Sequence, residues 1–260
     1  MIFQSQKSQI DQLSEFAKSG CHSVLIHGPK GSGKTYLAKQ YSDMLNISDI
    51  QVIKCDVSNI RGSIDSCISL KSNVVLCLEN LDTAVPAASY ALLKFLEEPL
   101  PNVYIVVTCR NVEKVPDTIL SRSVVITCSA PTDSDISKYA ESENISRYSS
   151  LRHTDIWKAV KSFSDAKLIL GMSSDQINYF CQIDSLMTFN DSVSNIVWTL
   201  GHYSDNTETP IQFVLQYIMI KTTSRTIKRS AMECIKDLTL GRVSTHAALS
   251  RFAFEAKYVE

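Results

Sequence analysis

The chain has 260 residues, of which 44% are apolar and 20% charged, and its formal net charge is −1. This composition excludes an intrinsically disordered chain and predicts buried cores, and the length allows two or three domains. A charge this close to zero excludes strong nonspecific attraction to nucleic acid, so any contact with DNA has to be local or supplied partly by other subunits.

No run of the sequence approaches the roughly 18 apolar residues needed to cross a membrane, and the start MIFQSQKSQIDQL is polar. We therefore expect a cytoplasmic protein with no membrane partner. The eight cysteines form no CxxC pair, and most sit in or beside apolar runs, where a free cysteine behaves as a small hydrophobe. We expect reduced core thiols, no disulfide framework and no zinc.

Strand-like and helix-like segments alternate over about the first 130 residues. Helical spacing marks residues 10–18 and 34–45, a short helix is expected after Gly62, and Pro86 can occupy the first turn of a helix that runs to about Glu98. The apolar runs predicted to be strands are residues 23–27, 50–55, 73–78, 102–109 and 123–128. Strands that alternate with helices imply parallel βαβ units and a doubly wound sheet.

After Pro131 the pattern is helical, with no further run of comparable strand character. The expected helices cover residues 133–141, 153–171, 174–187, 193–200, 211–220, 226–238 and 243–257. We therefore predict three domains: an α/β domain at residues 1–130, a helical lid at 131–172 and a helical bundle at 173–260.

The stretch GPKGSGKT fits the phosphate-loop pattern G-x-x-x-x-G-K-[ST] at every fixed position, between an expected strand and an expected helix. Its residues are Gly28, Pro29, Lys30, Gly31, Ser32, Gly33, Lys34 and Thr35. Glycines let backbone N–H groups wrap phosphate oxygens, and the start of the helix adds partial positive charge. Lys34 is expected to reach the β- and γ-phosphates and the Thr35 hydroxyl to ligate Mg²⁺, so the predicted cofactors are ATP or ADP with Mg²⁺. The alternative is a loop that binds nucleotide without turning it over.

A P-loop ATPase also needs a carboxylate at the end of a neighbouring strand to hold Mg²⁺, and usually a base that orients water. The expected strand at residues 73–78 delivers Glu79, Asn80 and Asp82. Only one acid therefore stands in the pair that directly follows this strand.

Two segments further along resemble a known family. ALLKFLEEPLPNV (residues 91–103) and VPDTILSRS (residues 115–123) resemble the AAA+ subunits of sliding-clamp loaders, which read ALLK-x-LEEPP and ILSRC at these points. This family includes the gamma and delta-prime subunits of DNA polymerase III and the small subunits of replication factor C. The resemblance covers roughly the first 130 residues. It implies an AAA+ P-loop domain with a five-stranded parallel sheet, a small helical lid and a C-terminal all-helical collar domain.

In the register of that family, Glu79 takes the metal-binding Asp position and Asn80 the catalytic Glu position. Glu can replace Asp as a metal ligand, whereas Asn cannot accept a proton, although it can orient a water molecule by hydrogen bonding. A slip by one residue would make Glu79 the base and leave Leu78 at the metal position. Either register predicts a damaged hydrolytic site.

The resemblance also implies roles for two arginines. Arg110, within TCRN, stands in or beside the sensor at the end of the fourth strand, as in the delta-prime branch of bacterial clamp loaders, whose subunit is not an active ATPase. Ser121-Arg122-Ser123 matches the family's Ser-Arg-Cys motif except for its last residue, which implies that Arg122 reaches the nucleotide of the adjacent subunit as an arginine finger. The alternatives are a solvated loop residue for Arg110 and a surface arginine before an edge strand for Arg122.

One segment of the expected lid resembles a further family motif. SFSDAKLIL (residues 162–170) faintly resembles the second sensor, with Lys167 in place of its Arg, although an ordinary helix explains the same pattern. The Cys₄ module that bacterial members often carry before the third strand is missing, so zinc is not expected. Arg61 lies where the family presents a helix to DNA, and either a phosphate contact or a solvated face fits it.

The resemblance thus implies a clamp-loader subunit of the delta-prime type, which binds nucleotide, donates Arg122 to a neighbour and has little ATPase of its own. The implied partners are the other subunits of a pentameric ring, the sliding clamp and primer–template DNA within the complex. Three alternatives stay open: a motor subunit that hydrolyses ATP with Glu79 and Asn80, an independent P-loop phosphotransferase, and a scaffold with an empty loop. The phosphotransferase is disfavoured because the lid has few of the arginines that such an enzyme needs.

Overall fold

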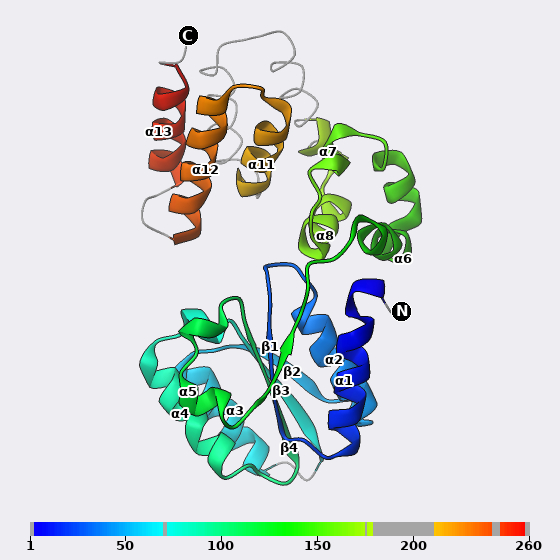
Figure 1. The fold of residues 1–260 in the computed structure, drawn as a ribbon, viewed down its shortest axis with the longest axis vertical. Coiled ribbons are helices and arrows are strands. Elements are labelled where there is room, and N and C mark those ends of the chain that lie inside the picture. The colour runs from blue at the N-terminus through cyan, green and yellow to red at the C-terminus, as the bar shows by residue number, and fades with distance from the viewer. Residues whose placement is uncertain (1–2, 70–71, 175, 179–210, 241–244, 258–260) are drawn as a thin grey trace. The chain divides into compact units, whose positions relative to one another are not determined.

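The computed structural model describes residues 3–69, 72–174, 176–178, 211–240 and 245–257 (Figure 1). They fall into two compact units. Unit 1 consists of Met1–Tyr139 with Ser162–Ser164, and unit 2 consists of Ala140–Lys161 with Asp165–Glu260. The predicted domain boundaries at residues 130 and 172 stay predictions, and the helix expected at residues 193–200 lies outside the described residues.

Unit 1 is built on a five-stranded sheet with the strand order β2-β3-β4-β1-β5. The strands are β1 (Ser23–His27), β2 (Ile50–Lys54), β3 (Val74–Glu79), β4 (Val103–Cys109) and β5 (Val124–Thr127). Every pairing between neighbouring strands is parallel, so the predicted parallel sheet is confirmed. The apolar runs located β1, β3 and β4 well because these inner strands are buried on both faces and are therefore mostly apolar, whereas the edge strands β2 and β5 are partly exposed.

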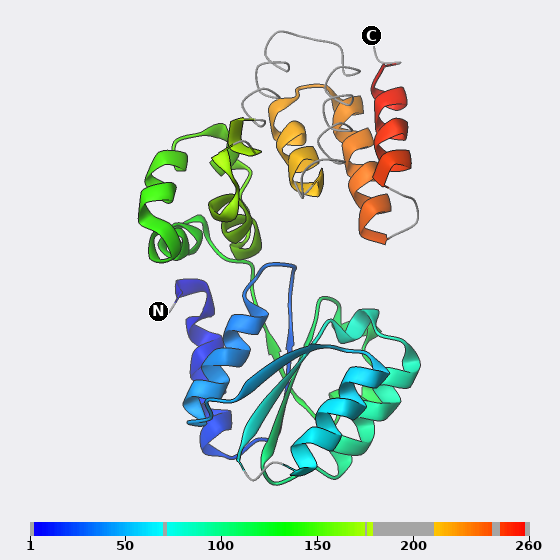
Figure 2. The ribbon, with the colours of Figure 1, turned by 180° about the vertical axis from the view of Figure 1, so that it is seen from behind.

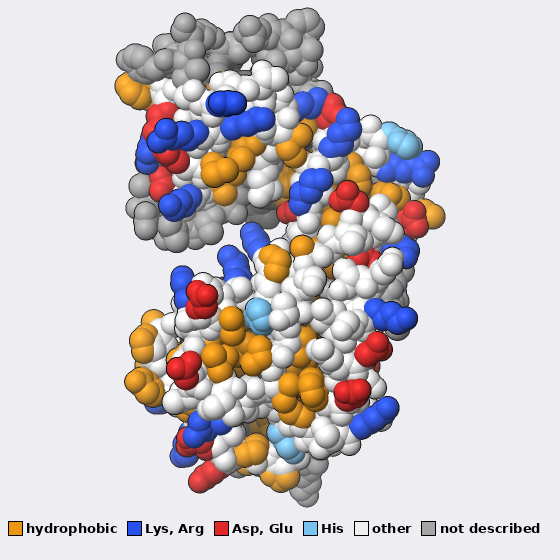
Figure 3. Space-filling view, in the orientation of Figure 1, with side chains coloured by type: hydrophobic (Ala, Val, Ile, Leu, Met, Phe, Trp, Pro, Cys, Tyr) orange, Lys and Arg blue, Asp and Glu red, His pale blue; other side chains and the backbone are white. Residues whose placement is uncertain are grey.

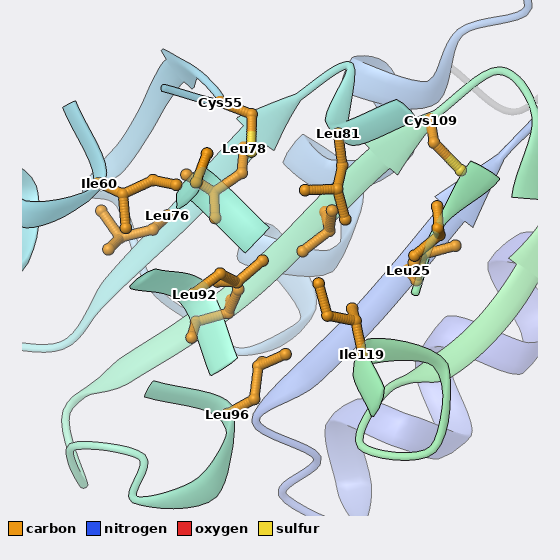
Figure 4. Packing of buried hydrophobic residues seen from close by; sticks show 14 of the residues in the cluster. Leu25, Cys55, Ile60, Leu76, Leu78, Leu81, Leu92, Leu96, Cys109 and Ile119 are labelled. Carbon is orange, nitrogen blue, oxygen red and sulfur yellow. The ribbon is translucent and has the colours of Figure 1, made fainter. Parts of the chain in front are cut away.

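Helices cover both faces of this sheet (Figures 1 and 2). They are α1 (Lys7–Lys18), α2 (Lys34–Met44), α3 (Val57–Ser69), α4 (Pro86–Glu97) and α5 (Asp117–Leu120). On one face, α1 and α2 form a buried cluster with Val24 and Ile26 of β1. On the other face, α3, α4 and α5 form a second cluster that includes Leu25 (Figure 4). Successive residues of β1 therefore face opposite cores, and each fully buried aliphatic side chain contributes about 1.5–3 kcal/mol to stability.

The start of α3 differs from the prediction. The helix expected after Gly62 begins earlier, at Val57, so the predicted start is wrong. The carboxylate of Asp56 accepts the backbone N–H of Asn59 at 2.8 Å, as the residue before a helix typically does. Ile60 is buried in the core, and its burial outweighs the cost of about 1 kcal/mol that a glycine brings to a helix interior.

The helix expected at residues 153–171 is also divided. It consists of α7 (Asp155–Lys158) and α8 (Phe163–Gly171), so the prediction of one helix is wrong. The carboxylate of Asp165 accepts the backbone N–H of Lys161 at 3.2 Å. A side chain that bonds the backbone in this way offers the chain an alternative to continuing the helix, which explains the break.

The region before α7 is a long helix with a kink. α6 (Asp133–Leu151) bends at Asn144, which has φ −158° and ψ 88°. In unit 2, Tyr148 of α6 packs edge-on against Trp157 of α7, with ring centroids 5.0 Å apart. Tyr148 belongs to a small buried cluster with Ala140 and Leu170, and the partly buried Trp157 packs against it.

Over the described residues 211–240 and 245–257, unit 2 is helical, as predicted, and residues 179–187 of the helix expected at residues 174–187 lie outside the described residues. The helices within these two described ranges are α11 (Ile211–Lys221), α12 (Arg225–Leu240) and α13 (Thr245–Lys257). Arg251 of α13 forms ion pairs with Glu233 and Asp237 of α12 at 3.0 and 3.1 Å, and basic and acidic side chains lie side by side on this surface (Figure 3). In the part of the chain that the structure describes, no helix has both the length and the apolar character to cross a bilayer.

Candidate functional site

The phosphate loop joins β1 to α2 at the carboxyl edge of the sheet. Gly33, directly before α2, has a φ of 96°, a left-handed conformation that residues with a side chain rarely adopt. A Cβ atom at Gly28 would lie 2.1 Å from the carbonyl oxygen of Cys128, so only glycine fits at this point. The two glycines therefore fix the path of the loop for backbone reasons, independently of any ligand.

Lys34 begins α2 and is 9% exposed. Its Nζ donates to the carbonyl oxygen of Gly28 at 2.8 Å and to that of Pro29 at 2.7 Å, so the ammonium is held against the loop. Burial lowers the pKa of Lys34, because a buried cation is poorly solvated, and an anion beside it would oppose that shift. The first N–H groups of α2 also lack partners within the helix. Together these groups form the kind of donor set that binds phosphate.

Three residues that the sequence did not point to also contact the loop. Gln6 donates its Nε2 to the carbonyl oxygen of Ser32 at 2.7 Å, and the thiol of Cys128 donates to the same oxygen at 3.3 Å. The backbone N–H of Phe163 donates to the carbonyl oxygen of Gly31 at 3.0 Å. The Gln6 Oε1 and Ser32 Oγ atoms are buried and have no hydrogen-bond partner among the described residues. No sequence pattern marks these contacts, because they join segments far apart in the chain.

Glu79 ends β3 and meets the phosphate loop directly. Its Oε1 accepts a hydrogen bond from the Thr35 hydroxyl at 2.7 Å, so the two residues predicted to hold Mg²⁺ lie together. Leu78 is 2% exposed and belongs to the core, which argues against the register that would put it at the metal position. Carboxylate and hydroxyl oxygens suit Mg²⁺, which usually takes one or two protein ligands and completes its shell with phosphate and water.

The described residues contain no group of three or more His, Cys, Asp or Glu side chains that could hold a metal ion. A Mg²⁺ at Thr35 and Glu79 would accordingly depend on oxygens from a bound nucleotide. The expectation that the protein lacks zinc stays a prediction.

Asn80 directly follows Glu79 and has an unusual backbone. Its φ and ψ are 58° and 52°, in the left-handed region, which asparagine tolerates better than most residues. Its backbone N–H donates to the Thr108 hydroxyl of β4 at 3.3 Å. Thr108 is a polar residue of β4 that is 2% exposed, and together with Arg110 it belongs to the TCRN segment in which the family's sensor is expected.

Arg110 lies in the loop after β4, and Asp82 fixes that loop. The two carboxylate oxygens of Asp82 accept the backbone N–H groups of Arg110 and Asn111, at 3.1 and 3.3 Å. The Arg110 residue is exposed. Burial is the main cause of the lowered pKa of Lys34, and the charge of Arg110 adds to it, so the field of Arg110 reaches the phosphate loop.

Arg122 lies in the turn between α5 and β5. Its Nη2 forms an ion pair with Glu97 Oε1 at 2.9 Å, and its Nη1 donates to the Thr118 carbonyl at 3.0 Å and to the Ser121 hydroxyl at 3.2 Å. The Arg122 side chain remains 37% exposed. It borders a cavity of about 400 Å³. The other residues that line this cavity are Cys21, His22, Ser23, Phe95, Leu96, Pro99, Ile105, Ser121, Ser123 and Val124.

Arg122 lies at the amino ends of the parallel strands, whereas the phosphate loop lies at their carboxyl ends. Arg122 precedes β5, whereas the loop follows β1, and these two neighbouring strands run parallel. A strand rises about 3.3 Å per residue, so the length of β1 alone separates the two features by about 15 Å. Arg122 therefore cannot serve a phosphate bound in the loop of its own chain.

Lys167 lies on α8, and its residue is exposed. It belongs to unit 2, whereas the phosphate loop belongs to unit 1. Its contact with nucleotide stays a prediction.

Comparisons with known families match two parts of the chain. Residues 56–132 match the family model described as DNA polymerase III, delta subunit, and this stretch contains Glu79, Asn80, Arg110 and Arg122. Residues 3–65, which contain the phosphate loop, match the model described as Magnesium chelatase, subunit ChlI. No curated protein sequence matches the chain.

Solved structures resemble the chain over most of its length. A DNA polymerase III gamma subunit-related protein from Thermotoga maritima has a TM-score of 0.61 at 14% identity, covering 95% of this chain and 98% of that chain. The RuvB Holliday junction branch migration motor of the same organism has a TM-score of 0.52 at 14% identity, covering 97% and 84%. At such identities the likeness shows the fold alone. Residues 56–132 are therefore similar to a DNA polymerase III clamp-loader family, and the chain shares the fold of a DNA polymerase III gamma subunit-related protein.

Proposed function

We propose that the protein is a clamp-loader subunit of the delta-prime type. It binds ATP or ADP with Mg²⁺, has little ATPase activity of its own, and contributes Arg122 to the nucleotide site of a neighbouring subunit. The observation that carries this proposal is the placement of Arg122 at the edge of the sheet opposite to the phosphate loop. A guanidinium placed there is too far away to contact a nucleotide bound in the loop of its own chain.

In the chain's own site, the residues of the phosphate loop would bind and orient the nucleotide. The N–H groups of the first turn of α2 and the Lys34 ammonium would neutralise phosphate charge. The Thr35 hydroxyl and the Glu79 carboxylate, already 2.7 Å apart, would hold the metal. A bound Mg²⁺ would supply charge neutralisation at the phosphates.

The same site lacks the group that hydrolysis most needs. The amide of Asn80 can donate and accept hydrogen bonds, but it cannot take a proton from an attacking water. Proton transfer to a placed base typically contributes a factor of about 10²–10⁴ to a rate. Weak or absent turnover follows from this residue, even when nucleotide is bound.

Arg122 has the chemistry of an arginine finger. Its guanidinium is planar, permanently charged and partly exposed, so it can stabilise the charge that develops on a transferring phosphoryl group. Such a residue contributes a factor of about 10³–10⁵ to turnover. The partners would be the other clamp-loader subunits, which we propose form a pentameric ring, together with the sliding clamp and primer–template DNA.

The test uses the complex that the chain forms with the ATPase subunit with which it co-purifies. We expect Arg122→Ala to lower the turnover of that complex at least about a hundredfold without loss of assembly, because the neighbour loses its finger. Steady-state ATPase assays and size-exclusion chromatography measure the two effects. Arg152→Ala, at another exposed arginine, is the control and should match the wild type.

The isolated chain separates the proposal from its rival, an active motor subunit. We expect turnover near the detection limit, with nucleotide binding that depends on Lys34. Robust turnover that disappears in Lys34→Ala would instead establish the motor subunit.

A further inference from the structure

Arg122 is held by Glu97, the last residue of α4. The Nη2–Oε1 distance is 2.9 Å, and the two side chains are 37% and 53% exposed. The main-chain carbonyl of Thr118 and the hydroxyl of Ser121 hold the other terminal nitrogen. These contacts occupy three of the five N–H donors of a guanidinium and leave two that can point to a ligand.

The position of Glu97 is unfavourable for its own helix. A helix carries partial negative charge at its carboxyl end, and an acidic residue there typically costs a few tenths of a kcal/mol or more. Glu97 is the final residue of α4, and Glu98 directly follows it. Because an exposed ion pair adds little to stability, neither helix formation nor the stability of the fold accounts for an acidic residue at this position. The orientation of the Arg122 guanidinium accounts for it.

The pair also joins two elements that are fixed to the same core. Leu92 and Leu96 of α4 and Ile119 of α5 belong to one buried cluster, in which their side chains converge (Figure 4). The backbone on both sides of the ion pair is therefore rigid. A carboxylate on a rigid helix end can fix the direction of the guanidinium, which has many rotamers when left alone.

We propose that Glu97 is a positioning residue for Arg122: it fixes the direction in which the guanidinium presents its remaining N–H donors to the phosphate of a neighbouring subunit. This inference rests on the proposed function of Arg122. Glu97 itself contacts no substrate. Its carboxylate acts only through the orientation of Arg122.

The first experiment measures kcat and KM of the co-purified complex. We expect Glu97→Ala to lower kcat about tenfold with KM and assembly unchanged, because a misdirected finger weakens only the transition state. Glu97→Gln keeps a hydrogen-bond acceptor at the same place and should recover most of the loss. Glu98→Ala removes the neighbouring exposed carboxylate and should equal the wild type.

A double variant tests whether Glu97 acts through Arg122. In a chain that already carries Arg122→Ala, Glu97→Ala should cause no further loss of turnover, because the guanidinium on which Glu97 acts is gone. Should Arg122→Ala itself leave turnover unchanged, the proposed function fails. If Arg122→Ala lowers turnover but Glu97→Ala matches or exceeds the wild type, or changes only KM or assembly, the positioning role alone is overturned.

The second experiment uses the isolated full chain and does not depend on activity. Phenylglyoxal modifies accessible arginines, and peptide mapping by mass spectrometry gives the rate at Arg122. We expect Glu97→Ala to raise this rate about two- to fivefold over the wild type and over Glu98→Ala, the shift that loss of an exposed ion pair supports. An unchanged rate would show that Glu97 does not hold the guanidinium in solution and would overturn the proposal.

Discussion

At the scale of single residues, the backbone at Asn80 matters as much as its side chain. Among the described residues, Asn46 and Asn80 are the non-glycine residues with positive φ. Asparagine is enriched in this region because its short polar side chain can bond locally, whereas most other side chains are strained by about 1–2 kcal/mol. Asn80 therefore fits its position for a structural reason as well as a chemical one.

We expect Asn80→Glu to lower the free energy of unfolding of unit 1 by about 1 kcal/mol, because glutamate is strained in the left-handed conformation. Asn80→Gly should be within about 0.5 kcal/mol of the wild type, since glycine adopts this conformation freely. Urea unfolding followed by far-UV circular dichroism measures both. A glutamate variant as stable as the wild type would contradict the role assigned to the backbone.

At the scale of elements, long apolar runs predicted the structure better than local signals did. β1 was predicted at residues 23–27 and lies there, because burial on both faces makes its central residues Val24, Leu25 and Ile26 apolar. The start of α3 was misplaced because Gly62 was given more weight than the capping carboxylate of Asp56. A short pattern near a glycine is easily outweighed by the burial of one side chain such as Ile60.

The candidate site was likewise predictable where it consists of a continuous motif and not where it depends on contacts between distant segments. The phosphate loop is a continuous motif, so the sequence alone predicts all its residues. The contact between Thr35 and Glu79 could be expected because the loop after β1 and the end of β3 both lie at the carboxyl ends of the parallel strands, with β4 between them. The contacts of Gln6, Phe163 and Glu97 depend on how distant segments pack, and no spacing in the sequence encodes them.

Unit 2 contains two ion pairs that share Asp155 and should make its stability depend on pH. Asp155 of α7 bonds to Lys158 at 2.5 Å and also pairs with Lys221 of α11. Hydrogen bonds from these two lysines lower the pKa of Asp155 to about 2, below the value of about 3.9 expected in the unfolded chain. The stabilisation is therefore complete above about pH 4 and is lost as the pH falls through the folded pKa.

We expect Asp155→Asn to be less stable than the wild type at neutral pH, and the two stabilities to converge between about pH 4 and pH 2. Because the side chain is 36% exposed, the difference should be small. Both tryptophans of the chain lie in unit 2, so urea unfolding followed by tryptophan fluorescence reports on this unit. A difference that persists unchanged at pH 2 would rule out the carboxylate as its source.

At the scale of the whole molecule, the proposed function places contacts with two different nucleotides at the two ends of the parallel strands. The loop with Lys34 would bind the chain's own nucleotide, and Arg122 would act on that of a neighbour. The rigid sheet between them separates the two chemistries in space. They should therefore be separable by mutation.

We expect Lys34→Ala to abolish nucleotide binding by the isolated chain while the assembled complex keeps most of its turnover, because the finger is intact. Arg122→Ala should show the reverse: normal binding by the isolated chain and loss of turnover in the complex. Titration with a fluorescent ATP analogue and ATPase assays of the complex measure the two properties. Equal effects of both variants on both properties would show that the edges are not independent.

The placement of Arg122 opposite the phosphate loop also has a consequence for symmetry. Two copies related by a twofold axis present the same patch to each other, whereas a contact that joins one edge of a sheet to the opposite edge of the next is heterologous and gives the assembly a direction. In any such row that does not close on itself, one end has a loop with no finger and the other has a finger with no loop to serve. A chain with an intact Arg122 and an amide at Asn80 suits the first of these ends, where its finger is used by one neighbour, its own loop receives no finger, and its own nucleotide need never be cleaved.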